Sequence, residues 1–144
     1  MSVALLDVNI LIAMFDTGHT HHQRAQAWFT RESPLGWATC PITVTGAARI
    51  LSSPAYPSPM PLADALSRIQ IACDHPTHVF WPDDVSILEE SLFRREQIGN
   101  HKKLTDAYLL GLAVRHRGRL ATFDRGLPLR AVIGAGEEHL CLLG

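Results

Sequence analysis

Hydrophobic residues occur along the chain either in short continuous runs or at helical spacing. The first run, residues 3–6, is unbroken and ends at Asp7, which predicts a strand buried on both faces, as in a parallel sheet. Further runs predict strands at residues 37–40, 78–81 and 119–123, and a last edge strand at 140–143. Between them, helices are expected at residues 9–15, 21–31, 43–52, 62–73, 85–97 and 105–116. This alternation predicts an α/β fold with a central, mostly parallel β-sheet of four or five strands flanked by helices.

Capping and loop residues mark several boundaries of these elements. Ser86 and Thr105 are placed to cap the starts of their helices, and Gly118 is placed to end the second of them. Four prolines fall between residues 53 and 61, and the polar stretch 98–104 contains glycine and asparagine, so both segments are predicted to be loops. No stretch resembles a linker between domains, so residues 1–144 are predicted to form a single domain.

Composition narrows the class of protein. The chain has 144 residues, a formal net charge of −1, 47% hydrophobic residues and 19% charged residues. Those values are typical of a globular domain and exclude a disordered chain or a histone-like polycation. Three widely spaced cysteines predict reduced thiols in a cytoplasmic protein, and no apolar run approaches the roughly 20 residues that span a bilayer, so no membrane association is expected.

Three acidic residues share one kind of position. Asp7 follows the first predicted strand, Asp124 follows the fourth, and Asp106 opens the helix before that fourth strand. Ligands of open α/β sheets bind beyond the carboxyl ends of the strands, and acids gathered there repel one another unless a cation lies between them. Mg²⁺ or Mn²⁺ is the expected cofactor, because hard divalent cations prefer oxygen ligands. Each acid alone could equally be a turn or helix-capping residue.

Several motifs, in order, resemble those of a known family. They are Leu5-Leu6-Asp7-Val8-Asn9 with the following residues to Ala13, His19-Thr20-His21-His22 with the following residues to Phe29, Thr39-Cys40-Pro41-Ile42-Thr43, Leu104-Thr105-Asp106-Ala107-Tyr108-Leu109-Leu110 and Leu120-Ala121-Thr122-Phe123-Asp124. The chain resembles the PIN-domain ribonucleases in these motifs and, more closely, the VapC toxins of bacterial toxin–antitoxin pairs. Order and spacing agree from Leu5 to about Leu127.

The resemblance implies a PIN-like fold and a metal-dependent endoribonuclease that acts as a toxin on structured RNA, either transfer RNA or ribosomal RNA. It implies that three acids form the catalytic and metal-binding cluster, surrounded by polar residues that support it. The cluster would be Asp7, Asp106 and Asp124, and the polar residues around it Asn9, Thr43 and Thr122. It also implies a homodimer and a VapB-type antitoxin whose C-terminal segment covers the site with a basic side chain.

One position departs from the family pattern. The family usually has a glutamate directly after the threonine that matches Thr43, and this chain has Val44 there, with no acid between residues 33 and 63. A site with three carboxylates can still function, since Mg²⁺ is held largely through water. The alternative is a catalytically weakened or inactive PIN-like module that binds RNA or an antitoxin. A phosphatase or nucleotide-binding protein is disfavoured because no glycine-rich phosphate-binding loop is present.

Basic residues concentrate in the last third of the chain. Residues 94–130 carry a net charge of +6, and the rest of the chain carries −7. Such a segment favours contact with a phosphate backbone, and the RNA-binding candidates are His101, Lys102, Lys103 and Arg125. The group His19, His21 and His22 could bind Zn²⁺, but no cysteine or fourth ligand follows at suitable spacing, so a polar helix start is the favoured interpretation.

Overall fold

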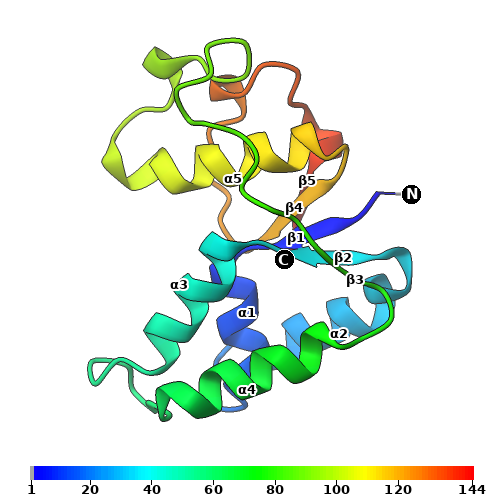
Figure 1. Ribbon diagram of the computed structural model, residues 1–144, viewed down its shortest axis with the longest axis vertical. Coiled ribbons are helices and arrows are strands. Elements are labelled where there is room, and N and C mark those ends of the chain that lie inside the picture. Colours follow the sequence, from blue (N-terminus) through cyan, green and yellow to red (C-terminus); the bar gives the residue numbers. More distant parts are fainter. Residues whose placement is uncertain (1) are drawn as a thin grey trace.

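The computed structural model describes residues 2–144 and places a five-stranded sheet at the centre of the molecule (Figure 1). The sheet order is β3-β2-β1-β4-β5, and all four strand pairings are parallel. The strands are β1 (Ala4–Leu6), β2 (Trp37–Thr39), β3 (His78–Phe80), β4 (Arg119–Thr122) and β5 (Leu140–Leu142). The prediction of a parallel sheet flanked by helices is therefore confirmed, and the last strand lies at an edge as expected.

Helices cover the sheet on both faces. In Figure 1, α1 to α4 lie below the sheet and α5 lies above it with the irregular segments that precede and follow it. Their bounds are α1 (Val8–Phe15), α2 (His22–Glu32), α3 (Pro41–Leu51), α4 (Leu62–Cys73) and α5 (Leu104–Arg115). Short 3-10 turns occupy Ser33–Leu35, Arg95–Gln97, His101–Lys103, Leu129–Ala131 and Glu137–His139. No helix among residues 2–144 is long and apolar enough to cross a bilayer.

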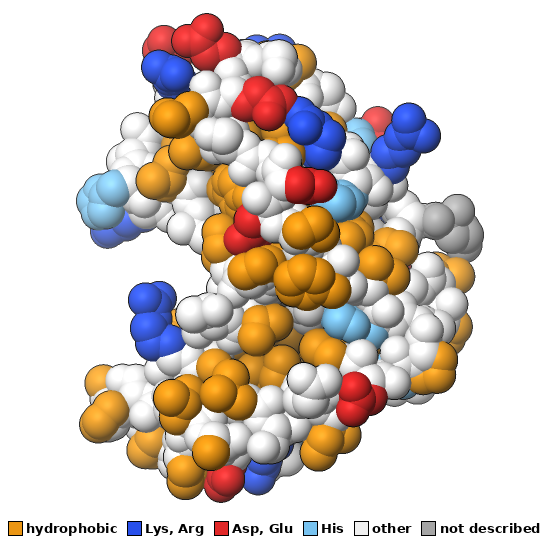
Figure 2. Space-filling view, in the orientation of Figure 1, with side chains coloured by type: hydrophobic (Ala, Val, Ile, Leu, Met, Phe, Trp, Pro, Cys, Tyr) orange, Lys and Arg blue, Asp and Glu red, His pale blue; other side chains and the backbone are white. Residues whose placement is uncertain are grey.

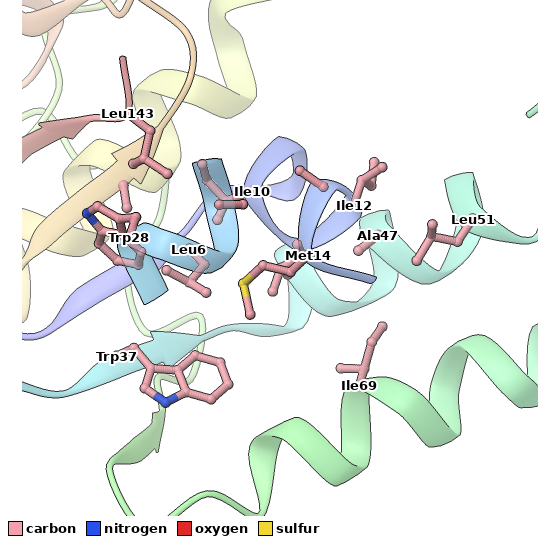
Figure 3. Packing of buried hydrophobic residues seen from close by; sticks show 14 of the residues in the cluster. Leu6, Ile10, Ile12, Met14, Trp28, Trp37, Ala47, Leu51, Ile69 and Leu143 are labelled. Atoms are coloured by element: carbon pink, nitrogen blue, oxygen red, sulfur yellow. The ribbon is translucent and has the colours of Figure 1, made fainter. Parts of the chain in front are cut away.

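Two hydrophobic cores lie on the two faces of the sheet. Figure 3 shows the larger one, in which Ile10 and Met14 of α1 meet residues of α3, α4 and the sheet, including Leu51, Ile69 and Trp37. The second core packs α5 against the opposite face of β1 and β4. Because β1 and β4 are buried between both cores, packing fixes the position of their carboxyl ends. The polar residues that directly follow these strands are therefore also fixed in position.

The predicted helix at residues 85–97 is wrong. The segment forms isolated turns and one short 3-10 turn, and part of its backbone pairs with a distant stretch of chain. Phe93 forms an antiparallel bridge with Val132, the Arg94 N–H donates to the Ala131 carbonyl at 2.8 Å, and the Ile133 N–H donates to the Leu92 carbonyl at 2.8 Å. Burial of Phe93 against α5 stabilises this arrangement over the locally favoured helix.

Two predicted caps of α5 also differ. Helix α5 begins at Leu104 rather than Thr105, and no side chain caps it. At its other end Arg117 adopts the left-handed conformation, with φ of 57°, and the Gly118 N–H donates to the Ala113 carbonyl at 2.8 Å. Gly118 is required for space instead of for its backbone angle, since a Cβ there would lie 2.5 Å from the Val3 carbonyl oxygen.

Candidate active site at the carboxyl ends of β1 and β4

Asp7 lies directly after β1 and begins helix α1. Its Oδ1 accepts a hydrogen bond from the Val8 N–H at 2.7 Å, and its Oδ2 accepts one from the Thr122 hydroxyl at 2.7 Å. The side chain is only 6% exposed. Burial raises the pKa of this carboxyl above its ordinary value, the two hydrogen bonds oppose that rise, and Asp124 adds to it. Asp7 is therefore a fixed, largely desolvated acid.

The Thr122 hydroxyl joins the ends of β1 and β4. It donates its proton to Asp7 and accepts hydrogen bonds from the Asn9 Nδ2 at 3.2 Å and from the Asp124 N–H at 3.1 Å. The Asn9 Oδ1 in turn accepts from the Phe123 N–H at 3.4 Å. One donor and two acceptor positions are thus all used, which fixes the orientation of the Asp7 carboxylate. Asn9 and Thr122 therefore both lie beside the first acid.

Asp106 and Asp124 complete the acidic group. Asp106 is in the first turn of α5, and its pKa is raised to about 6 by burial, by repulsion from Asp7 and by its contact with Asp124, while Lys103 acts in the opposite direction. Asp124 follows β4, and its Oδ1 accepts a hydrogen bond from the Gly126 N–H at 2.8 Å. The structure therefore brings the three predicted acids together, although they come from three separate elements.

The acidic group suits a hydrated divalent cation better than a fully liganded one. Among residues 2–144, no three His, Cys, Asp or Glu side chains are already arranged to ligate one ion directly. Mg²⁺ usually keeps several waters in proteins and is held by one or two carboxylates. Three mutually repelling carboxylates, two of them with raised pKa values, supply that oxygen chemistry, so the residues present fit Mg²⁺ or Mn²⁺.

Lys103, one of the four predicted RNA-binding residues, lies beside the acidic group. The Lys103 Nζ donates to the Gly126 carbonyl at 2.8 Å, which places its ammonium between the start of α5 and the loop after β4. His101, Lys102 and Arg125 are exposed. The +6 segment is not one continuous basic surface, because several of its arginines pair elsewhere: Arg95 with Glu90, Arg115 with Glu89 and Arg119 with Glu32.

Thr43 takes no part in the hydrogen bonds of the three acids, and Val44 has no polar side-chain atom to contribute to them. Thr43 is fully buried, and its hydroxyl is used locally, accepting from the Cys40 N–H at 3.1 Å and lying 3.1 Å from the Cys40 carbonyl oxygen. It therefore stabilises the start of α3 and touches no carboxylate. Val44 is half-buried and lines an apolar groove between α3, α4 and β3 with Leu66 and Ile69.

Gly126 is a site residue that the sequence motifs did not identify. Its N–H binds Asp124 and its carbonyl binds Lys103, so it holds an acid and a base of the site in place. A Cβ at Gly126 would lie 2.7 Å from the Lys103 Nζ. The signal was present in the sequence, because an aspartate followed two residues later by glycine is typical of a turn that the aspartate side chain closes.

Comparison with known proteins shows to which family this parallel α/β sheet with its group of acids belongs. The family model described as PIN domain matches residues 4–132, so the chain belongs to the PIN-domain family. Within that family it is similar to the VapC-type ribonucleases. It is 46% identical to Ribonuclease VapC44 of Mycobacterium tuberculosis over 97% of this chain and 99% of the relative, and 45% identical to Ribonuclease VapC39 of the same species over 93% and 97%.

A solved structure supports the fold independently. The crystal structure of M. tuberculosis VapC20, a toxin that cleaves the sarcin–ricin loop, superposes with a TM-score of 0.64 and covers 85% of this chain and 91% of its own. Its sequence identity to this chain is 12%, so the likeness concerns the fold. The predicted PIN-like architecture is thereby confirmed.

Proposed function

We propose that this chain is a metal-dependent endoribonuclease, the toxin of a toxin–antitoxin pair, and that it hydrolyses phosphodiester bonds of structured RNA, either transfer RNA or ribosomal RNA. The observation that carries the proposal is the meeting of Asp7, Asp106 and Asp124 beside the shared Thr122 hydroxyl. Relatives named as ribonucleases over nearly the whole chain support the activity.

In the proposed mechanism Asp7, Asp106 and Asp124 would hold a Mg²⁺ or Mn²⁺ ion. When bound, the ion would supply Lewis-acid activation of a phosphate oxygen and of the attacking water. Thr122 and Asn9 keep the Asp7 carboxylate oriented, which avoids reorganisation during the reaction. The Lys103 ammonium offers a positive charge to the phosphate. Water adds across the P–O3′ bond, leaving a 5′-phosphate and a 3′-hydroxyl.

Cleavage of total bacterial RNA by the purified protein, read by mapping new 5′ ends, tests this function. We expect discrete cleavage sites with Mg²⁺, none with EDTA, and none with the Asp7→Asn variant. Asp64→Asn is a matched control, because Asp64 is an exposed acid on α4 outside the site. No cleavage by the parent at any Mg²⁺ or Mn²⁺ concentration would reject the proposal in favour of an inactive binding module. Full cleavage by purified Asp7→Asn would reject the assignment of Asp7 to the catalytic group.

We propose a homodimer and a VapB-type antitoxin as partners. Figure 2 shows hydrophobic side chains gathering over α4 and β3. Leu66, Val79 and Phe80 are exposed there, the last by 56%, beside the groove of about 610 Å³ that Val44 lines. A contiguous apolar surface of this kind is typical of a protein interface. Co-expression with the product of an adjacent small reading frame should give a stable complex that no longer cleaves RNA.

A further inference from the structure

Two aromatic rings lie against each other beside the acidic group. His21, at the start of α2, and Phe123, between Thr122 and Asp124, have ring centroids 4.8 Å apart and planes tilted by 32°. The His19 ring lies a further 5.7 Å from His21. All three side chains are half-buried, so each keeps a surface open to solvent. The Phe123 backbone belongs to the site itself, since its N–H donates to Asn9.

No hydrogen bond of the described residues explains the position of the His21 ring. It makes no capping hydrogen bond to α2, and among residues 2–144 its ring has no hydrogen-bond partner. His22 differs, because its Nδ1 lies 2.8 Å from the Ala13 carbonyl and ties α2 to α1. The three histidines of the sequence motif therefore include one that joins two helices and one whose ring faces Phe123.

Two arginines follow the members of this ring pair closely in the chain, and both lie near the C-terminal residue Gly144. Arg24 is one helical turn beyond His21 on α2 and lines a cavity of about 240 Å³ with Arg31 and the C-terminal residues Leu142 to Gly144. Arg125 follows Asp124, and its guanidinium approaches Gly144. Arg24 and Arg125 are exposed and form no ion pair with any residue of 2–144. Aromatic faces interleaved with unpaired arginines are typical of single-stranded nucleic-acid binding.

We propose that the open face of the His21–Phe123 pair stacks an unpaired nucleobase next to the phosphate that is cleaved, and that Arg24 and Arg125 bind neighbouring phosphates of the same strand. The proposal rests on the proposed ribonuclease function and adds how the substrate is recognised. Because Phe123 directly precedes Asp124, a base stacked on the ring pair brings its own phosphate to the acidic group. Only a nucleotide out of a duplex can stack in this way, so cleavage falls in loops or bulges.

Substitutions at His21 test the stacking directly. We expect His21→Ala to lower kcat/KM for cleavage of a loop-containing RNA by about 10-fold, mostly through KM, because a base stacked on an aromatic side chain contributes about 1–3 kcal/mol. His21→Phe should restore cleavage to within about 2-fold of the parent. His75→Ala is the matched control, since His75 also packs on a phenylalanine ring, that of Phe29 at 6.1 Å, but lies in the turn after α4, outside the site.

A second readout does not depend on cleavage. A short single-stranded RNA that carries one 2-aminopurine is bound in EDTA, and stacking is followed by quenching of its fluorescence. The parent and His21→Phe should quench it, and His21→Ala should bind more weakly with little quenching. Should His21→Ala misfold by circular dichroism, the contrast between Phe123→Leu and Phe123→Tyr makes the same comparison from the other ring.

The outcomes separate the two proposals. If the parent cleaves RNA and His21→Ala cleaves and quenches equally well, the stacking inference is wrong while the ribonuclease function stands. If His21→Phe loses as much activity as His21→Ala, the imidazole acts by some means other than stacking, and the inference is again wrong. If the parent neither cleaves nor binds RNA, the proposed function and the inference both fail.

Discussion

Replacing Asp106 by asparagine distinguishes the folding stability that the acidic group loses by repulsion from the ribonuclease activity to which it contributes. In the metal-free protein, burial and the neighbouring carboxylates of Asp7 and Asp124 disfavour the ionised form of Asp106. They raise its pKa from 3.8 to about 6. For a fully buried group that difference would correspond to roughly 3 kcal/mol of lost stability above pH 6. Because Asp106 is only half-buried and solvent screens its repulsion, we expect about 1 kcal/mol.

The sign of the pH dependence follows from the raised pKa. The folded protein binds the proton more tightly than the unfolded chain, so the penalty is absent below about pH 4 and complete above about pH 6. Metal-free Asp106→Asn should therefore match the parent in stability at pH 4 and exceed it at pH 7 by about 1 kcal/mol, or about 3 °C in Tm for a chain of this size. Its ribonuclease activity should be lost.

Urea unfolding at both pH values, with EDTA and with Mg²⁺, measures this. Mg²⁺ should stabilise the parent, because a ligand that binds only the folded state adds to its stability. The effect on Asp106→Asn should be smaller, because the variant has lost one of the three carboxylates. Asp64→Asn is the control for the loss of a surface charge. Equal or lower stability of metal-free Asp106→Asn at pH 7 would refute the reasoning that the three carboxylates repel one another in the folded protein.

Three further predictions concern single positions. Val44→Glu should raise the rate of RNA cleavage at saturating Mg²⁺ if the missing family carboxylate limits the site, and an unchanged rate contradicts this. Gly118→Ala should lower the free energy of unfolding by about 2 kcal/mol, because its Cβ would lie 2.5 Å from both the Val3 oxygen and the buried Trp81 ring. Phe93→Ala should cost about 3–4 kcal/mol in urea unfolding, because Phe93 is 2% exposed and fills the core against α5.

Features set by local pattern could be predicted from the sequence. The continuous apolar runs of β1 and β4 indicate buried parallel strands, and the acids that follow them therefore belong at one edge of the sheet. The convergence of Asp7 and Asp124 then follows from the pairing of adjacent strands, Leu6 with Ala121. Asp106 is also a candidate from its place at the start of a predicted helix, but a position in the first turn of α5 does not by itself distinguish a ligand from a helix-capping acid. The family motifs favour the ligand.

Features set by distant contacts could not be predicted. Residues 85–97 have the hydrophobic spacing of a helix. The bridge from Phe93 to Val132 joins two positions far apart in the chain, so the sequence around Phe93 does not indicate it. The direction of a side chain is equally hidden, as Thr43 shows: its hydroxyl turns to Cys40 rather than to the acids. The packing of His21 on Phe123 could not be predicted either, because the two residues are far apart in the chain.

The hydrogen bond from Thr122 to Asp7 spans 115 positions of the chain. It exists only once β4 has inserted beside β1, at the centre of a sheet whose other half, β2 and β3, is made much earlier in synthesis. A nascent chain that ends before residue 119 has the Asp7 carboxylate but neither its partner strand nor Asp124. The complete acidic group can therefore form only after β4 and Asp124 have been made, when most of the chain has already left the ribosome.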